Sequence, residues 1–180
     1  NVVVVGNGTN NITTGRGIDT VSVGSGNNKV KAGSGNDRVE VVVAGSGSNN
    51  FDGQAGDDIL IGGGGADRLK GGSDNDVLIG LGGNDTLDGE AGHDVQSGGL
   101  GDDTLKGGYG NNVLLGGAGS DRLTGGNGID LLSAGTADED NNIAALIALL
   151  ANAIAGNANV TNAADDGVVD DLDSSSGADV

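Results

Sequence analysis

Residues 45–134 consist of one nine-residue unit repeated ten times: GSGSNNFDG, QAGDDILIG, GGGADRLKG, GSDNDVLIG, LGGNDTLDG, EAGHDVQSG, GLGDDTLKG, GYGNNVLLG, GAGSDRLTG and GNGIDLLSA. The first four positions of each copy are rich in turn-forming residues, the fifth is Asp or Asn, and the seventh is nearly always Leu. A fixed short period of this kind is typical of a solenoid, in which each copy stacks on its neighbours. The repeat therefore determines the fold.

The same period extends back to residue 1, with four further copies in residues 6–41. The ninth position of these copies is not glycine, as it is in the later ones, but Thr14, Val23, Ala32 or Val41. Because strand side chains alternate between faces, this difference predicts longer strands and a wider, Val-lined interior in residues 1–44 than in residues 45–135. Residues 42–44 then shift the frame, and we interpret them as a strand extension or bulge.

The seventh position of the later copies is predicted to face the interior. It holds Phe51, Leu60, Leu69, Leu78, Leu87, Gln96, Leu105, Leu114, Leu123 and Leu132. Gln96 is the one polar residue in this set, and we interpret it as a local packing defect whose amide bonds to neighbouring backbone.

The composition excludes several classes of protein. The 180 residues include 39 Gly, one Phe and one Tyr, with no Trp, Met, Pro or Cys, so the core must be small and aliphatic and no disulfide is involved. The formal net charge is -18, which opposes binding to nucleic acid and to anionic membranes and creates a need for cations. The longest apolar run, residues 143–151, is much shorter than the roughly 20 residues that span a bilayer. The regular spacing of the carboxylates argues against acidic disorder.

The period stops after Gly135. The acidic residues 136–140 favour a helix start, and the Ala/Leu/Ile-rich residues 143–155 predict a helix with one apolar stripe, formed by Ile143, Ile147, Leu150 and Ile154. Such a helix should be covered by the roll, by an adjoining segment or by a second copy. Residues 136–169 are thus predicted to be a helix and loop insertion, and residues 170–180 the start of a resumed roll. Since the chain opens with Asn and no signal-peptide pattern, we expect a piece of a longer or processed chain.

The unit is similar to the repeats-in-toxin (RTX) nonapeptide GGxGxDxUx, in which U is a large aliphatic residue. Residues 62–70 and 116–124 match this motif fully, and the resemblance covers residues 1–134 and returns at 170–180. It implies an all-β, right-handed parallel β-roll with two nonapeptides per turn, which binds calcium. It also implies a secreted bacterial protein that is exported unfolded through a type I machine and folds outside the cell.

Calcium takes six to eight hard oxygen ligands from carboxylates and carbonyls, so two stacked turns would complete one shell. With 18 residues per turn, and if the frame shift does not exchange the edges, the carboxylates form two columns. The first column is Asp19, Asp37, Asp58, Asp76, Asp94, Asn112 and Asp130. The second column is Asn10, Asn28, Asn49, Asp67, Asp85, Asp103 and Asp121, and Asp179 takes the same repeat position in the resumed roll.

Neighbouring aspartates within a column should bind calcium best. Pairs that contain Asn49 or Asn112 should bind more weakly, and pairs of two asparagines weakest. We expect about seven to ten calcium ions in all, and a roll that is largely unfolded without them.

No constellation of catalytic residues is recognisable, and we expect no enzymatic activity. His93, beside Asp94, is interpreted as a solvated turn residue, Asp57 and Asp102 as surface charges, and Tyr109 as exposed. Two functions remain. In the first, the roll would be a structural element of an extracellular fibre, surface layer or matrix, and would self-associate through its ends or through residues 143–155. Alternatively, it is a folding and secretion module for a toxin, hydrolase or adhesin whose activity lies elsewhere. Binding of a sugar or a mineral surface by the acidic faces is less favoured, because aromatic residues, which stack on sugar rings, are almost absent.

Overall fold

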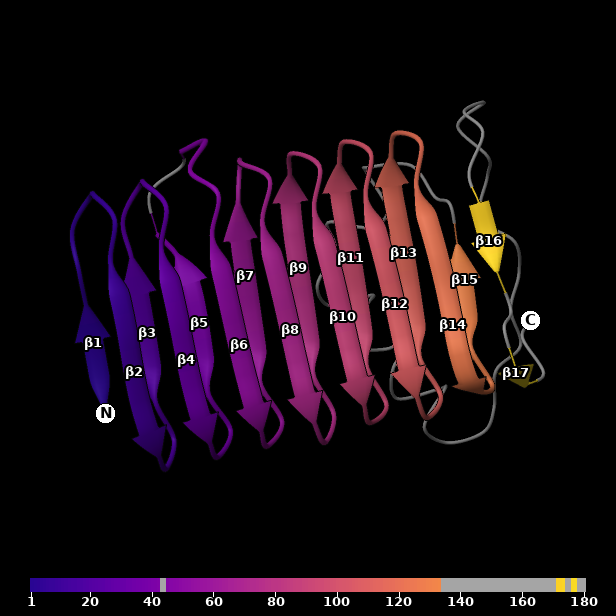
Figure 1. Cartoon of the computed structure of the whole chain (residues 1–180), viewed down its shortest axis with the longest axis horizontal. Coiled ribbons are helices and arrows are strands. Elements are labelled where there is room, and N and C mark those ends of the chain that lie inside the picture. Colours follow the sequence, from indigo (N-terminus) through magenta and orange to yellow (C-terminus); the bar gives the residue numbers. More distant parts are fainter. Residues whose placement is uncertain (43–44, 134–170, 174–175, 178–180) are drawn as a thin grey trace.

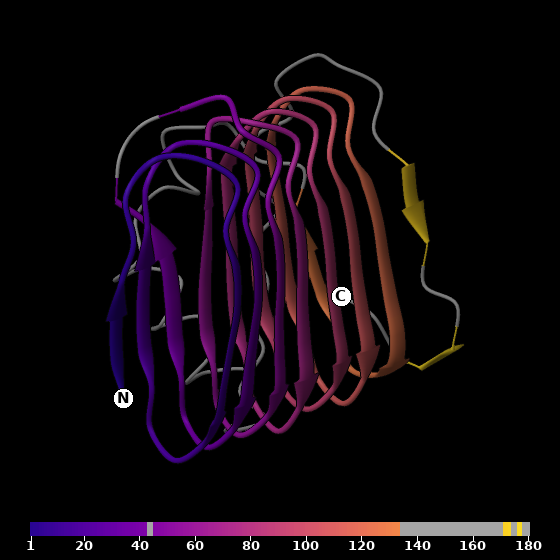
Figure 2. The ribbon, with the colours of Figure 1, turned by 60° about the vertical axis from the view of Figure 1, so that its left-hand side comes forward.

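The computed structural model describes residues 1–42, 45–133, 171–173 and 176–177. Over these residues the chain is a parallel β-solenoid in which each turn gives one strand to each of two sheets (Figure 1). Figure 2 shows the turns stacked one behind another. The predicted all-β solenoid is confirmed, whereas the predicted helix and Asp179 lie outside the described residues. In the described part of the chain, no helix has the length and hydropathy needed to cross a membrane.

The odd-numbered strands form one sheet of eight parallel strands, called here the odd sheet. In spatial order they are β1 (Val2–Val4), β3 (Thr20–Val23), β5 (Arg38–Val41), β7 (Ile59–Gly63), β9 (Val77–Gly82), β11 (Val95–Leu100), β13 (Val113–Ala118) and β15 (Leu131–Ser133). Each strand pairs with the one a full turn away.

The even-numbered strands form the facing sheet, called the even sheet. In spatial order they are β2 (Asn11–Arg16), β4 (Lys29–Ser34), β6 (Asn50–Ala55), β8 (Arg68–Ser73), β10 (Thr86–Ala91), β12 (Thr104–Tyr109), β14 (Arg122–Gly128) and β16 (Asp171–Asp173). The short β17 (Ser176–Gly177) also pairs with β14. Leu123 lies in register with Leu172, the residue predicted to face inward in the resumed roll; the resumption of the roll over residues 170–180 stays a prediction.

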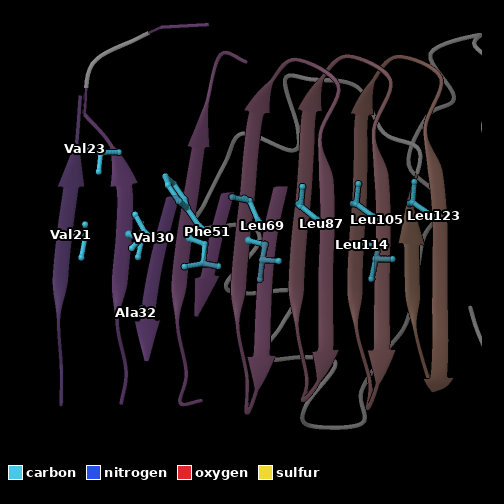
Figure 3. Close-up of a cluster of buried hydrophobic side chains, with 13 residues drawn as sticks. Val21, Val23, Val30, Ala32, Phe51, Leu69, Leu87, Leu105, Leu114 and Leu123 are labelled. Carbon is cyan, nitrogen blue, oxygen red and sulfur yellow. The ribbon is translucent and has the colours of Figure 1, made fainter. Parts of the chain in front are cut away.

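A single file of apolar side chains fills the space between the sheets (Figure 3). Its fully buried members are Val21, Val23, Val30, Ala32, Val39, Phe51, Leu60, Leu69, Leu78, Leu87, Leu105, Leu114 and Leu123. Leu132 packs against them at the end of the file. Burial of one such side chain contributes about 1.5–3 kcal/mol, and each half-turn provides two of them in β3 and β4 and one in the later strands. The predicted interior positions are confirmed.

Gln96 also faces the interior and is fully buried. Its Nε2 donates a hydrogen bond to the carbonyl oxygen of Lys106, as predicted from the need to satisfy a buried amide. The other amide atom, Oε1, has no hydrogen-bond partner among the described residues.

The three-residue frame shift changes the register of both sheets at the same turn. Val30 pairs with Phe51 and Val39 with Leu60, and the hydrogen bonds that cross this turn span 21 residues where the others span 18. Because both sheets absorb the same insertion, every later strand stays in its own sheet, so the edges of the solenoid are not exchanged.

The prediction of longer strands in residues 1–44 is wrong. The strands β3 and β5 have four residues, and β2 and β4 have six, which is the length of each strand from β8 to β13. β5 ends at Val41, directly before the frame shift, and its ladder with β3 ends at the pair Val23–Val41. In β2 and β4, and in the later copies, the ladder instead continues into the first position of the next repeat.

The first repeat position, within these longer strands, has a left-handed backbone. Gly72 has φ +129° and Gly99 has φ +107°, angles that glycine adopts without strain. The same position is held by Gln54, Leu81 and Glu90, with φ of 84°, 78° and 73°. A side chain in this region costs roughly 1–2 kcal/mol, so these three positions contain local strain, as does Asp74 in the turn before β9, with φ 78°.

Candidate metal-binding columns

The two predicted columns are present, one on each edge of the solenoid. Every first-column residue directly precedes a strand of the odd sheet, as Asp58 precedes β7, and every second-column residue directly precedes a strand of the even sheet, as Asp67 precedes β8. From Asp19 in the first column and Asn28 in the second, all of these side chains are buried. The repeat turn thus places one carboxylate or amide per half-turn just inside the edge.

A hydrogen bond from the backbone fixes one oxygen of each side chain. The N–H of Asp58 donates to Oδ1 of Asp76 at 2.8 Å, and the N–H of Asp67 donates to Oδ1 of Asp85 at 2.7 Å. The same bond recurs from turn to turn through both columns, at 2.6–3.1 Å. Each side chain therefore belongs to one turn and caps the preceding turn.

The second carboxylate oxygen has no such partner at the centre of the columns. Oδ2 accepts no hydrogen bond, although it is buried, in Asp37, Asp58, Asp67, Asp76, Asp85, Asp94 and Asp103. A buried anionic oxygen without a partner is strongly unfavourable. A ligand that supplies positive charge at these oxygens removes that cost.

A backbone carbonyl faces the same small space as this second oxygen. A Cβ placed on Gly62, the ninth residue of its repeat, would lie 2.5 Å from Oδ2 of Asp67 and 2.9 Å from the carbonyl oxygen of Gly80 in the next turn. The same arrangement recurs at Gly53, Gly80, Gly89 and Gly98. A carboxylate oxygen and a carbonyl oxygen from adjacent turns therefore converge, which is the kind of donor set that calcium takes.

The interior glycines are a part of the site that the sequence analysis missed. The signal was the change at the ninth position, which we used only to predict longer strands and a wider interior. In residues 1–44 this position carries a Cβ, as in Ala32 five residues before Asp37, whereas Gly53 stands five residues before Asp58. Since the Cβ occupies the space where the oxygens converge in later turns, residues 45–133 hold the more open sites.

Burial raises the pKa of the central carboxyls far above their ordinary value. The pKa is about 8 for Asp76 and Asp103, about 7 for Asp58, Asp85 and Asp94, and about 6 for Asp67. Loss of hydration is the main cause in each case, and the hydrogen bond from the preceding backbone N–H opposes it in part. Without a cation, the fold thus opposes ionisation of its own columns.

The asparagines in the columns replace an anionic oxygen by an amide nitrogen. Nδ2 of Asn49 donates to Oδ1 of Asp67 at 2.8 Å and to the carbonyl oxygen of Gly47 at 3.0 Å. Nδ2 of Asn112 lies beside Gly107, where an aspartate places Oδ2. A nitrogen that donates cannot also bind a cation, which is the physical basis for the prediction that the mixed pairs are weaker.

Main-chain oxygens must provide most of any coordination shell. Within the described ranges, no three His, Cys, Asp or Glu side chains gather closely enough to hold a metal ion by themselves. The stacked turns instead bring carbonyl oxygens of neighbouring glycines close to each carboxylate. This mixture suits calcium better than metals that require nitrogen or sulfur ligands.

An outer ladder at the fourth repeat position accounts for the remaining polar turn residues. The N–H of His93 donates to Oδ1 of Asn75, and Nδ1 of His93 accepts from the N–H of Asn111, both at 2.9 Å. His93 is accordingly a half-buried turn residue whose hydrogen bonds belong to this ladder. Asp57 and Asp102 are exposed as predicted, but they also accept backbone hydrogen bonds in the ladder.

The comparisons with known proteins agree with this geometry. The family model of the RTX calcium-binding nonapeptide repeat matches four times, at residues 4–39, 38–69, 61–96 and 97–132. No curated protein and no solved structure matches the chain.

Proposed function

We propose a function from one premise: the chain belongs to the RTX calcium-binding nonapeptide repeat family. Its solenoid is a β-roll with repeats that bind calcium, and the finer assignments below are our own proposal. The ligands are the aspartates of the two columns together with glycine carbonyl oxygens of adjacent turns. The observation that supports this assignment is the row of buried Oδ2 atoms without hydrogen-bond partners, each of which, from Asp58 to Asp103, lies beside an interior glycine.

The proposed sites differ in strength along the roll. Neighbouring aspartates such as Asp58 and Asp76, or Asp85 and Asp103, offer two anionic groups and an open space beside glycine. Asn49 and Asn112 weaken the pairs that contain them. When bound, calcium would supply positive charge beside the buried carboxylates, so that they remain ionised without water.

Calcium binding and folding are coupled in this proposal. A pKa raised from 3.8 to about 7, as in Asp58, means that ionisation costs on the order of 4 kcal/mol more in the folded chain than in the unfolded one. The same effect at several neighbouring carboxyls is comparable with the roughly 5–15 kcal/mol by which a domain is normally stable. At neutral pH the metal-free chain should therefore be largely unfolded, and calcium should drive its folding.

A test of this coupling is circular dichroism of the whole chain during a calcium titration. In excess chelator at pH 7.5 we expect little β-signal, and calcium should restore it with about seven to ten ions bound per chain by calorimetry. Magnesium, which keeps its water and requires a stricter octahedral geometry, should restore far less at the same concentration. A full β-signal in chelator would contradict the proposal.

For the cellular role, we propose a secreted, extracellular structural element, such as part of a fibre, surface layer or matrix. The supporting observation is the regularity of the described residues: successive turns repeat one stack, and polar turn residues such as His93 hold neighbouring turns together. We accordingly propose no enzymatic activity for this chain. The alternative is a folding and secretion module for an activity outside it.

Particle size distinguishes the two roles. Light scattering of the purified chain after addition of calcium should show growth to long assemblies if the roll is a structural element. A stable monomer under the same conditions would refute the structural role and favour a module that serves a neighbouring domain.

A further inference from the structure

The outer faces of the two sheets differ in chemistry. The even sheet presents charged side chains to solvent, including the ion pairs Lys31–Asp52 at 3.6 Å and Lys70–Glu90 at 3.0 Å. The odd sheet presents mainly aliphatic side chains from β9 onward. We call the following six residues the outer strip: Ile79, Val95, Ser97, Val113, Leu115 and Leu131.

The outer strip faces away from the core. Val95 and Ser97 flank Gln96 in β11, and Val113 and Leu115 flank Leu114 in β13. Because strand side chains alternate and the middle residues point inward, the flanking residues point outward. Four of the strip residues, with Val77, accordingly form a hydrophobic cluster separate from the interior file.

The outer strip is nevertheless buried. Val113 has an exposed fraction of 0%, Val95 of 1% and Leu115 of 5%. The outward Ile59 and Ile61 on the same sheet are only half-buried, and the outward Lys106 on the even sheet is exposed. All described strands belong to the two sheets, with the core between them, so these strands do not cover the strip.

We propose that the outer strip is the docking surface for residues 143–155 of the same chain. The chain leaves the odd sheet at Ser133 and rejoins the even sheet at Asp171, with residues 134–170 between. The equivalent connection from β13 to β14 needs only residues 119–121. The connection after β15 therefore has ample length to cross the outer face of the odd sheet before it returns.

The size and chemistry of this segment fit the outer strip. A helix of the 13 residues 143–155 would be about 20 Å long, and the four strands β9 to β15 extend over about 14 Å at the usual strand spacing. The apolar stripe predicted for this segment contains Ile143, Ile147, Leu150 and Ile154. Ser97, which lies in register between Ile79 and Leu115, has the smallest side chain of the outer strip.

The absence of cysteine from the sequence makes a crosslinking test direct. In the full, calcium-loaded chain, Val113→Cys is combined in turn with a cysteine at Ile143, Ile147, Leu150 or Ile154, and mild oxidation is followed by non-reducing electrophoresis. We expect at least one pair to form an intramolecular disulfide in more than half of the chains. The matched control combines the same four cysteines with Lys106→Cys on the even sheet, and should give less than a tenth of that yield.

Three results would overturn the proposal: crosslinks only between chains, which would identify a second copy as the occupant, equal yields from Val113 and Lys106, or no crosslink from any of the four positions. A second measurement does not depend on cysteine geometry. Ile147→Ser combined with Leu150→Ser should raise the fluorescence of an apolar-surface dye at least threefold, with the calcium-induced β-signal retained. Unchanged dye binding would also count against the docking.

Discussion

Substitution of a single interior glycine should lower both the stability and the number of bound calcium ions, whereas substitution of the next glycine in the same strand should lower neither. A Cβ at Gly62 would lie 2.5 Å from Oδ2 of Asp67 and 2.9 Å from the carbonyl oxygen of Gly80. Both distances are below normal van der Waals contact, and the carbonyl belongs to the sheet ladder, so the chain must shift. Overpacking of this kind costs about 1–3 kcal/mol, and the added methyl also fills the space where the two oxygens converge.

Gly63→Ala is the matched control for Gly62→Ala. A Cβ at Gly63 would meet only the side chain of Val41, at 3.6–3.7 Å, which is ordinary contact. Since glycine within a strand costs roughly 0.5–1 kcal/mol relative to alanine, this control should be neutral or stabilising. Urea unfolding of both variants at saturating calcium gives the two free energies, and calorimetry counts the ions. Gly62→Ala should lose about 2 kcal/mol and one ion. Equal stability and equal ion counts in the two variants would refute the reasoning.

Three further predictions follow from the columns and turns. In chelator, the β-signal should be present near pH 5 and lost by pH 8. The pKa of Asp58 is about 7 and that of Asp76 about 8, so between pH 4 and 8 the folded chain holds more protons than the unfolded chain and its stability falls as the pH rises. A β-signal that grows with pH would contradict this sign. Asn112→Asp should bind at least one more calcium ion by calorimetry, whereas Asn111→Asp, in the outer ladder, should leave the count unchanged. Leu81→Gly relieves the left-handed backbone at φ 78° and should raise the free energy of unfolding by about 1 kcal/mol, measured with urea at saturating calcium; a loss of stability would show that the exposed side chain matters more than the strain.

The sequence alone predicted the turn, the interior file and both columns, because a strict period fixes which residues stack. Leu69, Leu87 and Leu105 follow one another at the predicted spacing in the even sheet. Each column also stays on its own edge after the frame shift. The period alone could not predict this, because it depends on whether the three-residue insertion changes the register of both sheets in the same turn.

The features that the sequence did not reveal depend on contacts between turns. The clash beside Gly62 requires the carbonyl of Gly80, which lies 18 residues later and carries no side-chain signal. The role of His93 depends on an N–H of Asn111 in the next turn. The outer strip had a visible signal, because Val95 and Val113 recur at the 18-residue period. An alignment of the nine-residue copies places these valines in the same column as the charged residues of the even sheet, so the aliphatic pattern is lost.

The register between turns also determines how a chain of this kind can change in length. One nonapeptide is half a turn, so the loss of nine residues would preserve every motif and yet transfer all later strands to the opposite sheet. If the loss fell between β8 and β11, for example, the aliphatic side chains of β11 and β13 would emerge on the even sheet, on the face that carries Lys70 and meets water. The smallest change in length that keeps every strand in its own sheet is therefore two nonapeptides. Duplication or deletion in such genes should accordingly proceed in multiples of 18 residues within the uninterrupted array.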